Sequence, residues 1–325
     1  MEIGITYNSF AHKKMLPEEK ELKTTSFAIG KHLRKLGHHV CYFDMDSLDD
    51  IQALCTSKID VAFDTCERIH DDPRGEAYTA ALLEFLSIPH TRTSSFQIAL
   101  GVNKVRAKLL LAYNHIPIPR FQVFQNEEEV LRPDLPFPLF VKGVACENSI
   151  GIDEHSLVTN PQELKEQVRK INTLFNQPAL VEEFIPGREF SVAVLPGKTN
   201  CILPIMEIEF DDLPPHKRFL DYNAKWITHS DQYKRTVPVY PVNLTVEEQK
   251  TISETALNCF NIFGLHSYAR VDMRYNDHTP YVLEINQNPS INETGSGYVH
   301  SCENHGLNYT EMIEALLENA AQRHQ

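Results

Sequence analysis

Apolar and polar residues follow two different periods along the first third of the chain. Some segments alternate with the period of two that is typical of strands, and others carry an apolar stripe at helical spacing. The expected strands are 2–7, 39–43 and 61–63, and the expected helices are 19–36 and 76–86. Because strands alternate with helices, this pattern predicts an α/β domain with a parallel sheet over residues 1–100.

The remaining residues divide into two further units. Residues 101–184 predict a small central α+β domain, with helices at 103–114 and 161–171 and strands at 121–124, 138–142 and 179–183. Residues 185–325 are richer in strands and predict an α+β domain with an antiparallel sheet. Its expected strands are 189–195, 201–209, 268–273 and 281–285, and its last helix is 309–321.

Two details of the third unit carry more specific predictions. Thr245 and Glu248 form a capping box, so a helix should begin after Thr245 and end at Gly264. Residues 211–237 are polar and lack a clear period. A segment of that length predicts a long loop that is functional or mobile.

Composition and charge narrow the classes of partner. The chain has 31 Lys and Arg against 44 Asp and Glu, a formal charge of −13, which argues against nucleic acid or an anionic membrane as a partner. No apolar run approaches the roughly 20 residues that span a bilayer, and the first residues lack a signal-peptide layout. The charge does not exclude small-molecule substrates, since an anionic one needs only a local cluster of cations. The seven cysteines are scattered, without CxxC spacing, so we expect a reducing cytoplasm.

The densest chemical signal lies near the end of the chain. Arg270 and Asp272 are two residues apart, as are Glu284 and Asn286, so each pair shares one face of its strand. If the two strands form a hairpin, one face presents oxygen ligands that suit Mg²⁺ and a guanidinium that suits phosphate. The alternative is a solvated hairpin with ordinary surface charges.

Two further segments carry weaker signals. Lys104 at a helix start and Lys142 at a strand end could bind phosphate, and the Gly-containing segment 148–152 could bring backbone N–H groups close to it. Residues 181–190 run from a strand through a Pro-Gly turn into another strand, where exposed main chain could bind a purine edge and Glu189 a ribose. The alternatives are ordinary surface lysines and an acidic interdomain linker.

Together these segments resemble the ATP-grasp superfamily, and most closely the D-alanine–D-alanine ligase family. Tyr268-Ala-Arg270-Val-Asp272-Met, followed by Tyr281-Val-Leu283-Glu284-Ile-Asn286-Gln-Asn-Pro289, is similar to the family signature R-x-D … E-x-N-x-x-P. Residues 219–225, Phe-Leu-Asp-Tyr-Asn-Ala-Lys, resemble the D-Y-x-x-K lid segment. The likeness covers residues 60–325 well, and it implies the three-domain ATP-grasp architecture.

The resemblance implies a role for each candidate residue. Lys104 and Lys142 would hold the α- and β-phosphates of ATP. The segment Glu182, Glu183, Phe184 and Ile185 would read adenine, Glu189 would bind ribose, and the base would lie between Ile152, Phe219 and Leu283. Asp272, Glu284 and Asn286 would hold two Mg²⁺ ions, or Mn²⁺ in their place, with Glu284 bridging. Arg270, Lys225 and Ser149 would be the catalytic residues.

The implied reaction joins a carboxylate to an amine through an acyl phosphate, with amino-acid-like substrates and a homodimer in the cytoplasm. Several positions depart from the family pattern. The small loop Glu-Gly-Ser-Ser reads Cys146-Glu-Asn-Ser149, the lid Lys is followed by Trp226 instead of Tyr, and Ser290 replaces a Gly. The Gly-rich turn with an acidic residue near the acceptor is absent from the N-terminal segment. The alternatives are therefore a dipeptide or natural-product ligase that uses other amino acids, and an ATP-binding protein without ligase activity.

Overall fold

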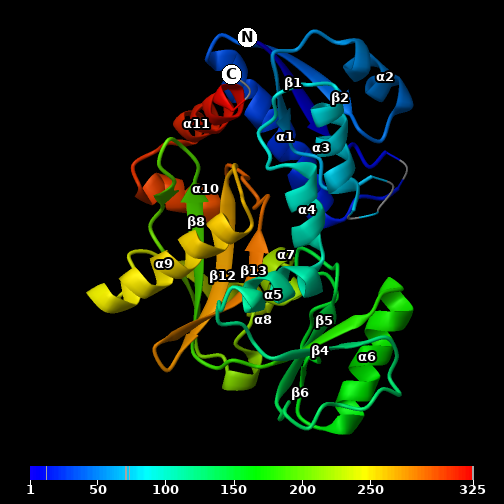
Figure 1. Ribbon diagram of the computed structural model, residues 1–325, viewed down its shortest axis with the longest axis vertical. Coiled ribbons are helices and arrows are strands. Elements are labelled where there is room, and N and C mark those ends of the chain that lie inside the picture. The colour runs from blue at the N-terminus through cyan, green and yellow to red at the C-terminus, as the bar shows by residue number, and fades with distance from the viewer. Residues whose placement is uncertain (12, 70–71, 73, 324–325) are drawn as a thin grey trace.

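The computed structural model describes residues 1–11, 13–69, 72 and 74–323. The chain forms three parts (Figure 1): an N-terminal parallel sheet, a small central antiparallel sheet and a large C-terminal antiparallel sheet. The predicted α/β class with these three sheets is confirmed. Among the described residues, no helix is long and apolar enough to cross a bilayer.

The N-terminal sheet has the order β2-β1-β3, with both pairings parallel. Its strands are β1 (Glu2–Tyr7), β2 (His39–Asp44) and β3 (Val61–Asp64), and its helices are α1 (Pro17–Lys35), α2 (Leu48–Thr56), α3 (Gly75–Phe85) and α4 (Ser95–Val102). Pro17 at the first position of α1 is preorganised for a helix. Glu18 and Glu19 follow in the first turn, where the helix dipole favours carboxylates. Both are buried, which brings carboxylates into the interior beside the site.

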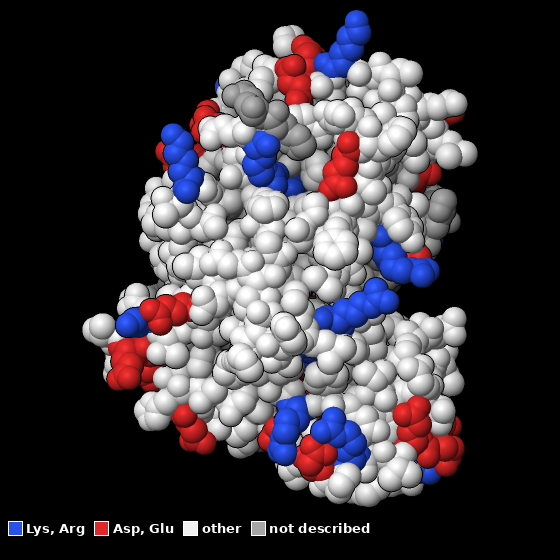
Figure 2. All heavy atoms as spheres, in the orientation of Figure 1, with Lys and Arg blue, Asp and Glu red and all other residues white. Residues whose placement is uncertain are grey.

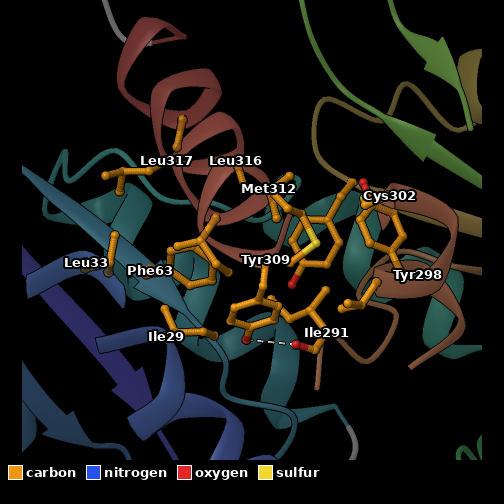
Figure 3. Close-up of a cluster of buried hydrophobic side chains, with 14 of the residues drawn as sticks. Ile29, Leu33, Phe63, Ile291, Tyr298, Cys302, Tyr309, Met312, Leu316 and Leu317 are labelled. Atoms are coloured by element: carbon orange, nitrogen blue, oxygen red, sulfur yellow. Dashed lines mark hydrogen bonds between the residues drawn. The ribbon is translucent and has the colours of Figure 1, made fainter. Parts of the chain in front are cut away.

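The last two helices of the chain return to this N-terminal part. They are α10 (Gly297–Asn304) and α11 (Tyr309–Gln322), and α11 packs against α1 and β3. Figure 3 shows the shared core, in which side chains of α11 meet those of α1 and β3; its labelled members include Ile29, Leu33, Phe63, Met312, Leu316 and Leu317. The Tyr309 hydroxyl donates a hydrogen bond to the Ile291 carbonyl at 2.9 Å. The domain limits at residues 100 and 184 stay a prediction.

The central part is an antiparallel sheet with the order β4-β7-β5-β6. Its elements, with the helix that leads into it, are α5 (Lys104–Tyr113), β4 (Phe121–Phe124), β5 (Leu139–Gly143), β6 (Leu157–Val158), α6 (Pro161–Phe175) and β7 (Ala179–Glu183). The apolar face of α6 packs on the sheet through Leu164, Val168 and Ile171, three residues of one helical stripe. This sheet forms the lower right part of Figure 1.

The C-terminal sheet has the order β11-β10-β8-β12-β13, with β9 beside β8. Its strands are β8 (Arg188–Leu195), β9 (Cys201–Ile202), β10 (Met206–Phe210), β11 (Thr236–Val239), β12 (Ala269–Asn276) and β13 (Thr279–Asn286). The helix α9 (Val246–Ile262) covers one face through Ile252, Ala256 and Phe260. Its capping box at Thr245 is present as predicted, with Gly264 in the left-handed region just past its end.

Two predictions for this part were wrong. Residues 201–209 form two strands, because Pro204 lacks the N–H that a continuous ladder needs. Residues 211–237 are not a loop, since they contain the 3-10 turn η1 (Pro215–Lys217), α7 (Tyr222–Trp226), α8 (Asp231–Lys234) and the start of β11. The two short helices begin at the caps Asp221 and Ser230. Each is too short to show a helical period in the sequence.

Candidate functional site

The hairpin of β12 and β13 carries the densest group of charged side chains. Its register places Arg270 opposite Asn286 and Asp272 opposite Glu284, so the expected pairing is confirmed and these side chains share one face. The Arg270 guanidinium donates to both oxygens of Asp272, at 2.8 and 2.7 Å. Asn286 Nδ2 donates to Asp272 Oδ2 at 2.8 Å. Hard oxygen donors and a guanidinium therefore lie together.

Lys104 joins this group from the first position of α5. Its ammonium forms an ion pair with Glu284. Burial acts to raise the pKa of Glu284, but the ammonium groups of Lys104 and Lys142 outweigh it and lower that pKa to about 2. Glu284 is therefore ionised at neutral pH, which is the form that binds a metal ion.

The hairpin residues fit a hard divalent cation. Within the described part of the chain, no group of three or more His, Cys, Asp or Glu side chains is arranged to hold a metal ion. The hairpin instead offers two carboxylates, from Asp272 and Glu284, and the amide oxygen of Asn286, a set without nitrogen or sulfur ligands. Oxygen ligands of this kind suit Mg²⁺ that completes its shell with water and phosphate oxygens.

A second ion-pair group lies on the central sheet, around Glu182. Its carboxylate is 2.6 Å from Lys108 Nζ and 2.7 Å from Lys142 Nζ, and all three residues are buried. Burial would raise the pKa of Glu182, yet the two ammonium groups lower it. Glu182 therefore fixes the position of Lys142 instead of facing solvent.

The connection between β7 and β8 forms an apolar slot. Phe184 and Ile185 line it from this connection. The Phe140 and Phe219 rings meet edge to face at 5.1 Å, so an aromatic pair joins the central sheet to the segment before α7. Ile152 and Leu283 complete its apolar walls. A flat ring fits such a slot.

A buried carboxylate closes one end of the slot. Glu189 accepts hydrogen bonds through Oε2 from Arg274 Nη2 at 2.7 Å and from Nε at 3.1 Å. Burial raises the pKa of Glu189, although Arg274 opposes this change. Its other oxygen, Oε1, is left for a ligand, and a ribose hydroxyl is a donor of suitable size.

The segment around α7 covers the small loop of the central part. Ser149 Oγ donates to the Leu220 carbonyl at 3.1 Å, and Lys225 Nζ donates to Asn148 Oδ1 at 3.1 Å. Trp226 Nε1 donates to the Asn148 carbonyl at 2.9 Å. Burial, and after it the positive charge of the nearby Arg270, lowers the pKa of Lys225. These contacts hold a closed arrangement with Lys225 inside.

One cavity of about 400 Å³ brings all of these groups together. Every candidate residue expected from the sequence lines it: Arg270, Lys225, Ser149, Lys104, Lys142, Ile152, Glu182, Glu183, Phe184, Ile185, Glu189, Phe219, Leu283, Asp272, Glu284 and Asn286. The side chain of Glu183 also reaches outward, where Arg120 donates to it at 2.8 and 3.0 Å. Figure 2 shows one face of the molecule, where Lys and Arg side chains lie beside the indentation above the central part.

Several residues of the site were missed from the sequence. Lys108 follows Lys104 by one helical turn, and Arg274 follows Asp272 by one strand period, so both spacings offered a signal. Glu18 offered no such signal, because α1 is far in sequence from the other residues of the site. Glu18 nevertheless reaches the segment that covers the site, since it accepts a hydrogen bond from the Tyr222 hydroxyl of α7 at 2.9 Å.

The fold and this site define an ATP-grasp ligase. Residues 110–318 match the model of the family described as D-ala D-ala ligase C-terminus, and the chain belongs to the D-alanine–D-alanine ligase family. It is 31% identical over 266 residues to the uncharacterized protein y4sG of Sinorhizobium fredii, covering 81% of this chain and 75% of that protein. It is 28% identical to the D-alanine–D-alanine ligase of Carboxydothermus hydrogenoformans, over 98% of this chain and 97% of that one.

A solved structure shares the whole fold. The crystal structure of the D-alanine–D-alanine ligase from Bacillus anthracis superposes with a TM-score of 0.81 at 23% identity, over 100% of this chain and 98% of that chain. The same ligase complexed with ATP gives a TM-score of 0.77 at 22% identity. The three-part architecture is therefore that of the family.

Proposed function

We propose that this protein is an ATP-dependent ligase that joins the carboxylate of one amino-acid-like substrate to the amine of another. The observation that carries the proposal is the meeting of Asp272, Glu284 and Asn286 with Lys104 and Arg270 at one cavity. Such a group neutralises the charge that develops when a phosphoryl group moves to a carboxylate. Family membership supports the same reaction class.

ATP would lie between the central and C-terminal sheets. Lys104 and Lys142 bind its α- and β-phosphates, and Lys225 approaches the γ-phosphate from the closed segment. The base occupies the slot of Ile152, Phe219 and Leu283, where the Glu183 carbonyl and the Ile185 N–H read its edge. Glu189 binds the ribose. The similarity to a ligase complexed with ATP is consistent with this placement.

Two Mg²⁺ ions, or Mn²⁺ in their place, would be held by Asp272, Glu284 and Asn286. When bound, these ions screen the triphosphate and polarise its terminal phosphoryl group. Arg270, which already donates to Asp272, stabilises the negative charge beside them.

The reaction would proceed in two steps. In the first, a carboxylate oxygen of the acyl substrate attacks the γ-phosphorus of ATP, the bond to the β-phosphate oxygen breaks, and ADP leaves. In the second, an amine nitrogen attacks the carbonyl carbon of the acyl phosphate, phosphate leaves with the electron pair of the C–O bond, and the amine loses one proton. Ser149 and the segment around α7 exclude water, which would otherwise hydrolyse the acyl phosphate.

A second candidate is a ligase for amino acids other than D-alanine. Trp226 contacts the Asn148 carbonyl through its indole N–H, so no hydroxyl is available at this position for a substrate network. Trp226 is not among the residues proposed to hold the nucleotide, so this difference leaves that part of the site intact. A homodimer remains a prediction.

The test is phosphate release by the full-length protein with ATP, Mg²⁺ and a panel of D- and L-amino acids, with products identified by mass spectrometry. Glu284→Gln keeps the size of the side chain and removes its charge, so we expect turnover to fall about 100-fold or more. Glu254→Gln on the exposed surface of α9 is the matched control and should retain full turnover. Near-normal phosphate release by Glu284→Gln would refute the metal assignment.

A further inference from the structure

Asn148 joins the small loop of the central part to the elements on either side of it. Lys225 Nζ of α7 donates to its amide oxygen Oδ1 at 3.1 Å, and Trp226 Nε1 donates to its backbone carbonyl at 2.9 Å. On the other side, Asn148 Nδ2 donates to Glu67 Oε2 at 3.3 Å, from the segment after β3. One residue of the loop therefore contacts both the segment around α7 and the N-terminal part.

The two partners of the Asn148 carboxamide fix its orientation. An ammonium group only donates hydrogen bonds and a carboxylate only accepts them, so the amide oxygen faces Lys225 and the amide nitrogen faces Glu67. The backbone of Asn148 lies in the left-handed region, with a φ of 55°, which asparagine tolerates better than most residues. The family pattern has serine at this place in the loop, so the amide oxygen is a feature of this chain.

Lys225 is held differently from three other cations that line the main cavity. Lys104, Lys142 and Arg270 each pair with a carboxylate, whereas Lys225 donates to a neutral amide oxygen. Its ammonium also lies 5.4 Å from the centre of the Trp226 ring, which is a cation–π distance. A phosphate attracts an ammonium more strongly than either neutral group does. Of these four cations, Lys225 is therefore the one that a phosphate can take most easily.

Lys225 also lies close to the residues proposed to hold the metal ions. It lines the main cavity together with Asp272 and Glu284. Burial and then the charge of Arg270 lower the pKa of Lys225, while Glu67, Asp272 and Glu284 act in the opposite direction. The ammonium is thus near the place where the terminal phosphate of a metal-bound nucleotide would lie.

We propose that Asn148 is a positioning residue that holds Lys225 before nucleotide binds, and that the γ-phosphate of ATP then binds the ammonium in place of the amide oxygen. The two oxygens compete for one cation. ATP must therefore break a contact that ADP, which has no γ-phosphate, leaves intact. This inference rests on the proposed function, which brings Lys225 to the γ-phosphate.

The experiment measures dissociation constants by calorimetry on the full-length protein with Mg²⁺. The ligands are ADP and an ATP analogue that has nitrogen between the β- and γ-phosphorus and resists hydrolysis. Asn148→Ser removes the amide oxygen and introduces the family residue. Because only water then competes for Lys225, we expect the analogue to bind about three- to tenfold more tightly and ADP to bind as before.

Three further variants make this comparison specific. Asn148→Gly is a second variant without the amide, since glycine accepts a positive φ without strain. Asn258→Ser makes the same chemical change on the exposed surface of α9 and should leave both constants unchanged. Lys225→Met removes the cation, so adding Asn148→Ser to it should no longer alter binding of the analogue.

The fluorescence of Trp226 gives an independent readout, because it is the only tryptophan of the chain. Loss of the Lys225 ammonium from its ring should change the emission more with the analogue than with ADP. Equal changes would contradict the proposal.

The outcomes separate this inference from the proposed function. If the analogue binds Asn148→Ser and Asn148→Gly no more tightly than the wild type, the inference is overturned and the proposed function is unaffected. The same holds if the effect persists with Lys225→Met or appears in Asn258→Ser. If the wild type binds neither nucleotide, both fail. If binding follows the expected pattern but no amino acid supports phosphate release, the ligase function fails and the inference stands.

Discussion

Glu182 offers the sharpest test of how the site is held together. Glu182→Gln removes the charge of a residue that is 2% exposed and lies within 2.7 Å of two ammonium groups, those of Lys108 and Lys142. The change leaves two buried cations close together without a counter-ion. Removing one partner of a buried ion pair costs about 3–5 kcal/mol. Because burial already lowers the pKa of Lys108, that lysine can lose its proton, so we expect a loss near the lower limit, about 3 kcal/mol.

The measurement is urea unfolding followed by circular dichroism, with the free energy of unfolding taken from the midpoint and slope. The neighbouring residue provides a matched control. Glu183→Gln makes the same chemical change on the same strand, but its ion pair with Arg120 is partly exposed, with side chains 28% and 48% accessible. An exposed pair contributes about 1 kcal/mol or less. The two variants should therefore differ by about 2 kcal/mol.

The double variant Glu182→Gln with Lys108→Met tests the cause of the loss. It removes one of the two uncompensated cations and should recover part of the lost stability. Equal losses in Glu182→Gln and Glu183→Gln would refute the reasoning, because they would mean that the buried carboxylate does not hold the lysines. A double variant that is less stable than Glu182→Gln would point to packing of the Lys108 stem instead.

Two further predictions concern residues of the closed segment and the small loop. The pKa of Glu147 is about 7 in the folded state, above its ordinary value of 4.5. Between these two pH values the native state keeps a proton that the unfolded chain has lost, so the free energy of unfolding falls as pH rises from about 4.5 to 7. The free energy of unfolding of Glu147→Gln should therefore exceed that of the wild type by about 1–3 kcal/mol at pH 8 and equal it near pH 4. Urea titrations at both pH values measure this difference. Tyr222→Phe removes the hydroxyl that donates to Glu18, so the closed segment should admit water. Phosphate released per product formed should then rise, and an unchanged ratio would contradict the role of this contact.

Local patterns in the sequence predicted those parts of the molecule that depend on near neighbours. The strand period placed Arg270 with Asp272 and Glu284 with Asn286, and pairing of the two strands needed only a short turn. The contacts that assemble the site come from long-range packing, as when Glu18 of α1 meets Tyr222 of α7. The periodicity of apolar and polar residues along the sequence does not indicate such a contact. Short elements such as α7 and α8 were missed for a related reason, since four or five residues contain little more than one turn.

The ion pairs of the site explain how a cavity with so many charges can be stable before any ligand arrives. Lys104 is paired with Glu284, Arg270 with Asp272, and Lys142 with Glu182, so each of these three cations has a carboxylate that holds it in place. Lys225 is held instead by the amide oxygen of Asn148. For Lys104 and Arg270, that carboxylate is also a proposed metal ligand. On ligand binding, the phosphate oxygens of the nucleotide would then bind these cations, and the metal would bind the carboxylates of Asp272 and Glu284 that the cations release. Because neither exchange alone preserves charge balance in a buried site, the geometry favours binding of the two together.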